Sequence, residues 1–152
     1  MKRLIALLLL ALTLAACYTR TGPATLLNRE LLLPVGWVSG LTGTPMRLAC
    51  DKREEDAGYI RWAWEETEGL TKLLVVEFQF TPADAGRLYE QAVAGAEPKP
   101  AQPGVSACCD ARALHLLIGS YYIKVSMLGI EDDEKAQKQI TTLLTEALST
   151  KE

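Results

Sequence analysis

The sequence lacks the short motifs that accompany most hydrolytic, metal-dependent and nucleotide-dependent chemistry. It contains no G-x-S-x-G elbow, no H-E-x-x-H pair and no glycine-rich phosphate loop, and His115 is its single histidine. The acidic groups at 65–68 and 132–133 fall in a predicted turn and at a predicted helix start, where solvation and the helix dipole account for them. We therefore expect no catalytic residue, no bound cofactor and no metal site.

The sequence also lacks an apolar run long enough to span a bilayer. Its longest run, 4–14, follows the cations Lys2 and Arg3 and ends in small residues before Cys17. A helix over 4–16 would be roughly 20 Å long, against ~30 Å for the hydrocarbon core of a membrane. Two cations, a short apolar segment and small residues at its end indicate a signal peptide.

The end of this segment, Leu14-Ala15-Ala16-Cys17, is similar to the lipobox of bacterial lipoprotein precursors. The resemblance implies that Cys17 receives a diacylglyceryl group and, after removal of 1–16, becomes the acylated N-terminus. The alternative is an ordinary secretory signal, but Leu14 stands where an A-x-A cleavage site requires a small residue. Several acyl chains give durable anchoring, because each buried methylene contributes about 0.8 kcal/mol.

The residue after the lipobox cysteine is Tyr18, and 17–24 are polar and rich in glycine and proline. By the same resemblance, an aspartate at this position would favour the inner membrane. Tyr18 therefore favours the outer membrane facing the periplasm, if the host has one. We expect 17–24 to be the acylated N-terminus and tether, and 25–152 to fold as a single domain.

Positive charge is scarce. Without Lys2 and Arg3, 14 basic residues face 19 acidic ones, which gives a formal charge of −5. Nucleic-acid-binding domains usually have a basic face, so this balance argues against a nucleic-acid partner.

Acylation of Cys17 would leave an odd number of cysteines, namely Cys50, Cys108 and Cys109. In an oxidising compartment we expect one disulfide, between Cys50 and either Cys108 or Cys109, since adjacent cysteines on a strand point in opposite directions. Such a bridge would stabilise the domain by roughly 4 kcal/mol. Free buried thiols, a vicinal Cys108–Cys109 disulfide, and redox or metal chemistry that also recruits Asp110 and His115 remain alternatives. No C-x-x-C pair supports the last one.

Alternating apolar and polar residues predict the strands of the domain. Strands are expected at 46–51, 59–65 and 71–80, and again from 105 onward, where Gly119-Ser120 matches a two-residue type II′ hairpin. That hairpin pairs Ile118 with Tyr121, Leu116 with Ile123, Leu114 with Val125, and His115 with Lys124. A charged turn is expected at 51–58.

Helical spacing and capping signals predict three helices, over 25–32, 82–94 and 132–148. The second begins with Thr81 as a cap, Pro82 in the first turn and Asp84 in the capping-box position. Glycine and proline predict loops at 36–45, where Trp37 and Val38 would pack into the core, and at 97–104.

The order α-β-β-β-α-β-β-α predicts an α+β fold, a mainly antiparallel sheet of about five strands packed with two or three helices. This order and the segment GSYYIKV resemble the PsbP-like sandwiches of several exported lipoproteins, which implies a fold and no activity.

Large aromatic residues are the remaining candidates for a binding site. Trp62 and Trp64 fall on one face of a predicted strand, and we expect them in the core; the alternative is a binding surface for an apolar ligand or peptide, formed with Tyr122. We expect His115 to be a surface or partly covered strand residue.

The sequence thus favours a non-enzymatic lipoprotein of the bacterial cell envelope, held at the membrane by its lipid and binding a partner protein or ligand there. An apolar small-molecule or lipid-binding module, and a thiol, redox or hydrolytic enzyme, are the alternatives.

Overall fold

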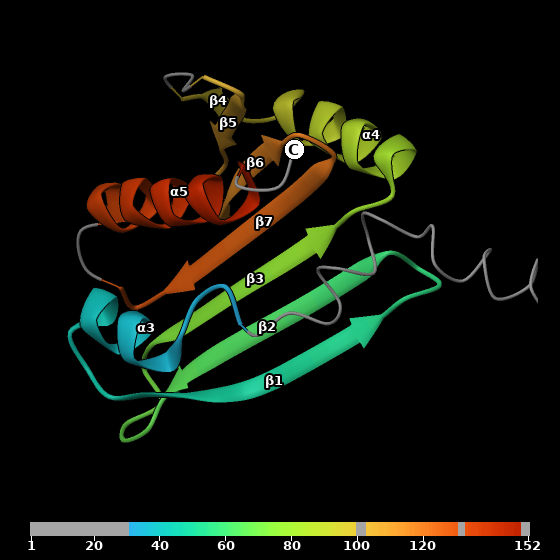
Figure 1. Cartoon of the computed structure of the whole chain (residues 1–152). Coiled ribbons are helices and arrows are strands. Elements are labelled where there is room, and N and C mark those ends of the chain that lie inside the picture. Colours follow the sequence, from blue (N-terminus) through green and yellow to red (C-terminus); the bar gives the residue numbers. More distant parts are fainter. Residues whose placement is uncertain (1–30, 100–102, 131–132, 150–152) are drawn as a thin grey trace, which may run out of the picture.

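A computed structural model describes 31–99, 103–130 and 133–149 of the chain (Figure 1). The fold is α+β, as predicted: an antiparallel sheet of seven strands in the order β1-β2-β3-β7-β6-β5-β4, packed with helices. Its elements are α3 (Val35–Thr42), β1 (Met46–Glu54), β2 (Tyr59–Glu66), β3 (Leu73–Gln79), α4 (Pro82–Val93), β4 (Glu97–Pro98), β5 (Val105–Cys109), β6 (Ala113–Ile118), β7 (Tyr121–Leu128) and α5 (Asp133–Ser149).

The predicted hairpin between β6 and β7 is confirmed. Ile118 pairs with Tyr121, Leu116 with Ile123, Leu114 with Val125 and His115 with Lys124. Gly119 has a φ of 54° and Ser120 is not among the residues with positive φ, the combination that a type II′ turn requires. The turn residues therefore set the register, and with it the face on which each side chain of these two strands lies.

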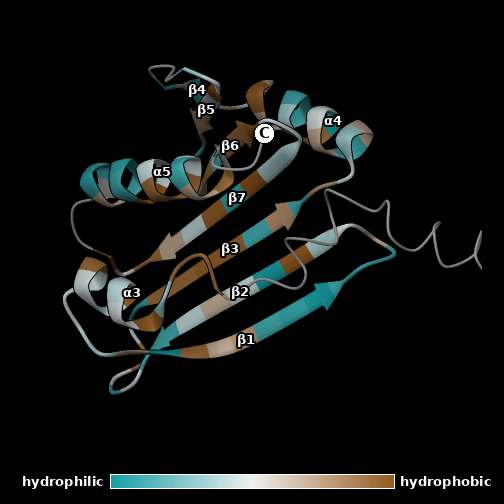
Figure 2. Cartoon of the chain, in the orientation of Figure 1, coloured by the Kyte–Doolittle hydropathy of each residue, from teal (hydrophilic) through white to brown (hydrophobic). Residues whose placement is uncertain are grey.

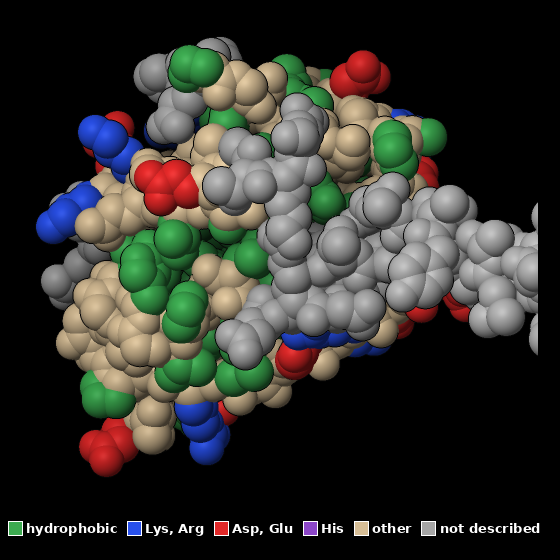
Figure 3. Space-filling model, in the orientation of Figure 1, with side chains coloured by type: hydrophobic (Ala, Val, Ile, Leu, Met, Phe, Trp, Pro, Cys, Tyr) green, Lys and Arg blue, Asp and Glu red, His purple; other side chains and the backbone are tan. Residues whose placement is uncertain are grey.

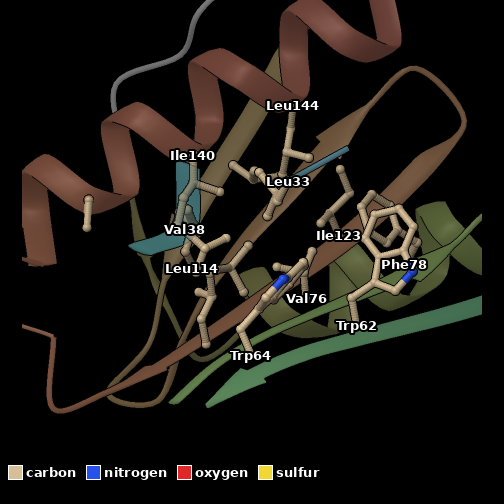
Figure 4. Packing of buried hydrophobic residues seen from close by; sticks show 14 of the residues in the cluster. Leu33, Val38, Trp62, Trp64, Val76, Phe78, Leu114, Ile123, Ile140 and Leu144 are labelled. Carbon is tan, nitrogen blue, oxygen red and sulfur yellow. The ribbon is translucent and has the colours of Figure 1, made fainter. Parts of the chain in front are cut away.

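The core lies between one face of the sheet and the helices α3 and α5 (Figure 4). Ile60, Trp62 and Trp64 of β2 alternate onto this face, beside Val76 and Phe78 of β3. From the helical side the main buried residues are Leu33, Val38, Ile140 and Leu144. Hydrophobic residues face the core and polar residues face away from it, which is the pattern of an antiparallel sheet covered on one side.

The opposite face of the sheet is covered only in part. The helix α4 packs against β5, β6 and β7. It lies on the side away from α5, because its Tyr89 bonds Cys108, which shares a face with His115 and not with the core residues Leu114 and Leu116. None of the described helices makes a comparable contact with the same face of β1 and β2.

Two predictions about helices were wrong in part. Leu31 and Leu32 are not helical, and the rest of the predicted helix 25–32 lies outside the described residues. The stretch 36–45, predicted as loop, instead contains most of α3, which begins after Pro34 and ends at Gly43 in the left-handed conformation (φ 70°). Gly36 and Gly40 are exposed, and both disfavour the helix because glycine has a low helix propensity. Burial of Val38 stabilises the helix in spite of them.

The strand count also differs from the five predicted. The chain from 105 to 118 forms two strands because Asp110 turns it, and Glu97–Pro98 adds a short β4 within the predicted loop 97–104. The strand β1 continues to Glu54, so the charged turn is shorter than predicted. Thr81 is the N-cap residue of α4 as predicted, but its hydroxyl donates to Asp84 Oδ2 (2.8 Å) and makes no capping bond to the backbone.

Candidate functional site

His115 is buried, with 5% of its surface exposed, and not a surface residue as predicted. It lies on β6 between the core residues Leu114 and Leu116, so its side chain points to the opposite face. There α4 covers the sheet. The prediction was wrong because the strand pattern shows which face a residue occupies but not whether a distant helix packs over that face.

Both ring nitrogens of His115 have partners. Nε2 lies 3.1 Å from Asp110 Oδ2, and Nδ1 lies 2.8 Å from the hydroxyl oxygen of Tyr122. An ionised carboxylate can only accept, so Nε2–H donates a hydrogen bond to Asp110; in the neutral imidazole Nδ1 then accepts the hydroxyl hydrogen of Tyr122. The rings of His115 and Tyr122 are nearly parallel, 13° apart, with centroids separated by 6.0 Å. Burial raises the pKa of Tyr122 to about 12, so the hydroxyl keeps its hydrogen.

Asp110 joins this network to the turn between β5 and β6. Its Oδ1 accepts from the backbone N–H groups of Arg112 (2.7 Å) and Ala113 (2.8 Å). The N–H of Arg112, then the His115 side chain and the N–H of Ala113, lower the pKa of Asp110 to about 2. An aspartate that bonds the backbone two residues ahead is a common turn signal, and it could have located this turn in the sequence.

Cys108 stands opposite His115 in the β5–β6 pairing but is not activated by it. Its thiol bonds Tyr89 of α4, and burial raises its pKa, which disfavours the nucleophilic thiolate. Since both nitrogens of His115 are engaged, neither is left to accept a proton from Cys108. The His115, Asp110 and Tyr122 side chains form a hydrogen-bonded network on the sheet, and the Cys108–Tyr89 bond joins the neighbouring strand to α4.

The predicted disulfide is absent, and all three described cysteines are free. Cys50 lies on β1 while Cys108 and Cys109 lie on β5, with β2, β3, β7 and β6 between them. Five strand spacings correspond to roughly 24 Å, whereas Cα atoms joined by a disulfide are less than about 7 Å apart. The prediction failed because the two strands that bear cysteines lie in different halves of the sheet, a separation set by topology.

The adjacent cysteines Cys108 and Cys109 point to opposite faces of the sheet. Cys108 faces α4, whereas the thiol of Cys109 faces α5 and donates to Gln137 Oε1 at 3.3 Å. Burial raises the pKa of Cys109 as well. Within the described ranges, no three side chains of His, Cys, Asp or Glu come together as metal ligands.

Trp62 and Trp64 are fully buried, which confirms their predicted place in the core. The rings of Trp62 and Phe78 meet edge to face, with their centroids 5.0 Å apart. The indole Nε1–H of Trp62 donates to Asp51 Oδ1 at 3.0 Å. Trp64 Nε1 is buried without a hydrogen-bond partner in the described part of the chain. Tyr122 lies on the other face of the sheet, with His115, so the alternative binding surface made of these three aromatic residues does not form.

On the face opposite the core, β1, β2 and β3 bear polar side chains, several of which pair with a side chain on the neighbouring strand. Arg47 Nη2 lies 2.6 Å from Glu65 Oε1. Glu77 Oε1 accepts a hydrogen bond from the Tyr59 hydroxyl (2.7 Å), and Glu77 Oε2 lies 3.9 Å from Lys124 Nζ. Burial and the neighbouring Glu77 raise the pKa of Tyr59. Opposite charges face each other at Arg61–Glu77 and Glu77–Lys124, whereas two cations, Lys52 and Arg61, stand opposite each other between β1 and β2.

Cys17, the predicted lipidation site, lies outside the described residues. Among those residues, no helix combines the length and the apolar character needed to cross a membrane. Searches of protein-family models, curated proteins and solved structures found no match to this chain.

Proposed function

We propose that this chain is a lipoprotein of the bacterial cell envelope, anchored through lipid on Cys17, whose domain binds a partner protein or ligand near the membrane surface. The observation that supports it is Leu14-Ala15-Ala16-Cys17 directly after a short apolar run and two cations. Residues 18–30 then separate the acylated cysteine from the first described residue, Leu31, so the anchor keeps the domain close to the bilayer.

A non-enzymatic role is part of this proposal. It is supported by the engagement of both nitrogens of His115 and by the raised pKa of the Cys108 thiol. If the purified protein turned over a hydrolase or thiol-exchange substrate, and His115→Ala or Cys108→Ser abolished that turnover, the non-enzymatic assignment would be wrong.

The lipid anchor is tested by intact mass spectrometry of the full-length gene product purified from bacterial membranes. We expect the mass of the chain from Cys17 plus its lipid. A Cys17→Ala variant should lose that mass, whereas a Cys50→Ala variant, which removes a cysteine from β1, should retain it. An unmodified Cys17 in the membrane fraction or in the culture fluid would contradict the proposal.

A further inference from the structure

One end of the domain includes a long stretch without charged residues. The 16 residues from 31 to 46, LLLPVGWVSGLTGTPM, include no Asp, Glu, Lys, Arg or His. They contain the whole of α3, on which Gly36 and Gly40 are exposed and Leu41 is partly exposed. The partly exposed Trp37 lines a shallow hollow together with Lys138, Thr142 and Glu146 of α5. In the space-filling view no charged side chain lies over α3 (Figure 3). Surface helices of soluble domains usually have a charged outer face, so α3 is an exception.

Two further segments lie beside α3 at this end of the sheet. The loop between β2 and β3 is joined to the C-terminal end of α3 by bonds from Thr67 N to Pro45 O (3.0 Å) and from Lys72 Nζ to Thr42 O (2.8 Å). The end of β7 is packed against the same loop, since any side chain at Gly129 would collide with the carbonyl of Thr71. We call these three segments the apolar end: α3 with 43–45, the loop 67–72, and 128–129.

The apolar end presents two leucines to solvent. Leu70 is 66% exposed and Leu128 is 64% exposed, and the described residues include only one other large exposed hydrophobic side chain, Val93. Leu70 is also the one described non-glycine residue with positive φ, at 52°. This conformation is unfavourable for a leucine, and such strain is found most often where a residue has a function.

The loop holds Leu70 in place with its own polar groups turned inward. The Glu66 carboxylate accepts from the backbone N–H (3.0 Å) and the hydroxyl (2.7 Å) of Thr71, and Lys72 is bonded to Thr42. Glu68 is the exposed carboxylate that remains in the loop. Leu70 is therefore presented on a loop that these bonds hold in place, with Glu68 as its exposed charged neighbour.

The other end of the sheet has the opposite character. All six residues from 51 to 56 are charged, where β1 turns into β2, and Figure 2 shows this end as hydrophilic. At the opposite end of β1 and β2, beside α3, the exposed charges include the Arg47–Glu65 ion pair and Glu68, so this end is less densely charged than 51–56. A domain polarised in this way has a preferred orientation at a boundary between an apolar phase and water.

We propose that the apolar end lies against the bilayer that holds the anchor, with Trp37, Leu70 and Leu128 in the interfacial region and the charged turn at 51–56 pointing away. This inference rests on the proposed lipid anchor. Thirteen residues, 18–30, can span up to roughly 45 Å, enough to let the domain turn this end to the membrane. Tethering raises the local concentration of membrane, so a few apolar contacts suffice for binding. Tryptophan and leucine suit this interface. Lys72 is the one cation of the apolar end and its Nζ bonds Thr42 O, so we expect the contact not to depend on anionic lipid.

The test uses the lipidated full-length product reconstituted in phosphatidylcholine vesicles with brominated acyl chains, which quench nearby tryptophans. Trp62 and Trp64 are fully buried and serve as unquenched internal references. We expect bromine-dependent quenching that disappears in Trp37→Phe. Joint replacement of Leu70 and Leu128 by glutamate should remove most of it, whereas Val93→Glu, a matched change of an exposed apolar residue on α4, should leave it unchanged.

Leu70→Gly tests whether a loss of quenching in the glutamate variants comes from misfolding. Glycine accepts a φ of 52° without strain, so this variant should be at least as stable as the parent and still show weaker quenching. Raised salt should have little effect on quenching in any variant.

The outcomes separate the inference from the anchor. A lipidated protein that sediments with the vesicles while Trp37 stays unquenched overturns the inference and leaves the anchor intact. A protein that bears no lipid and does not sediment overturns both.

Discussion

The two faces of the sheet bury their side chains in different ways. Toward α3 and α5 the strands bury large apolar groups, including Trp62, Trp64 and Phe78, and tolerate the unpartnered indole N–H of Trp64. Beneath α4 the sheet buries His115, and there both polar ring atoms have partners. The comparison shows that area removed from water stabilises the first face, whereas complete hydrogen bonding is the condition for burial on the second.

The largest effect is expected from truncation on the core face. Phe78→Ala should lower the free energy of unfolding by about 3–5 kcal/mol, because Phe78 is fully buried and contacts Trp62. Leu117→Ala, on the opposite face and only half-buried, should cost about 1–2 kcal/mol. Urea unfolding followed by circular dichroism measures both values. Equal losses would contradict the assignment of the main apolar core to one face.

Removing the histidine tests the hydrogen-bonded face. His115→Ala should lower the free energy of unfolding by about 1–3 kcal/mol, since it leaves the Tyr122 hydroxyl and one oxygen of Asp110 without their partner. Lys124→Ala is the matched control, because Lys124 pairs with His115 across the hairpin and is more exposed. Its cost should stay within about 0.5 kcal/mol. A control that is as damaging as His115→Ala would argue that the hairpin and not the network is responsible.

The same network should appear in the acid stability of the domain. The folded-state pKa of Asp110, about 2, is below the ordinary value of 3.8, so its ionised form stabilises the native state. This contribution is complete above the ordinary pKa and is lost as the pH falls from 3.8 toward 2. Thermal unfolding between pH 5 and 2 should therefore show a shallower decline for Asp110→Asn than for the parent. Parallel pH profiles would exclude Asp110 as a source of acid sensitivity.

The smallest effect separates the two core tryptophans. Trp62→Phe removes a hydrogen bond to Asp51, whereas Trp64→Phe removes a buried donor that has no partner within the described residues. Both substitutions replace an indole with a phenyl ring, so the loss of packing is similar. Because only Trp62→Phe also breaks a hydrogen bond, it should be more destabilising by about 1 kcal/mol. Comparison of the two unfolding midpoints at equal denaturant slope gives the difference. The reverse order would show that packing, and not the indole N–H, distinguishes the two positions.

Local patterns predicted the elements that depend on neighbouring residues. Alternation located β2 and β3, and Gly119-Ser120 set the register of β6 and β7, because a turn constrains only the strands that it joins. The helix α3 escaped prediction since its glycines and flanking prolines are loop signals, and its stability comes from packing of residues such as Val38.

Prediction of the candidate sites was weaker. The core position of Trp62 and Trp64 followed from the strand pattern, but the burial of His115 and the separation of Cys50 from Cys108 did not. Burial of His115 requires α4, and the distance between the cysteines depends on β7 lying between β3 and β6. Both are relations between segments far apart in the chain, which no local spacing encodes.

By itself, the sequence determined the α+β class, the β6–β7 register and the face that each strand residue occupies, because turn geometry and the two-residue repeat act over short distances. Only the tertiary structure decided that His115 is enclosed with Asp110 and Tyr122, that the cysteines stay apart, and that α3, Leu70 and Leu128 gather at one end of the domain. Those features depend on strand order and on which helix covers which face, and both follow from how the whole chain buries its apolar surface.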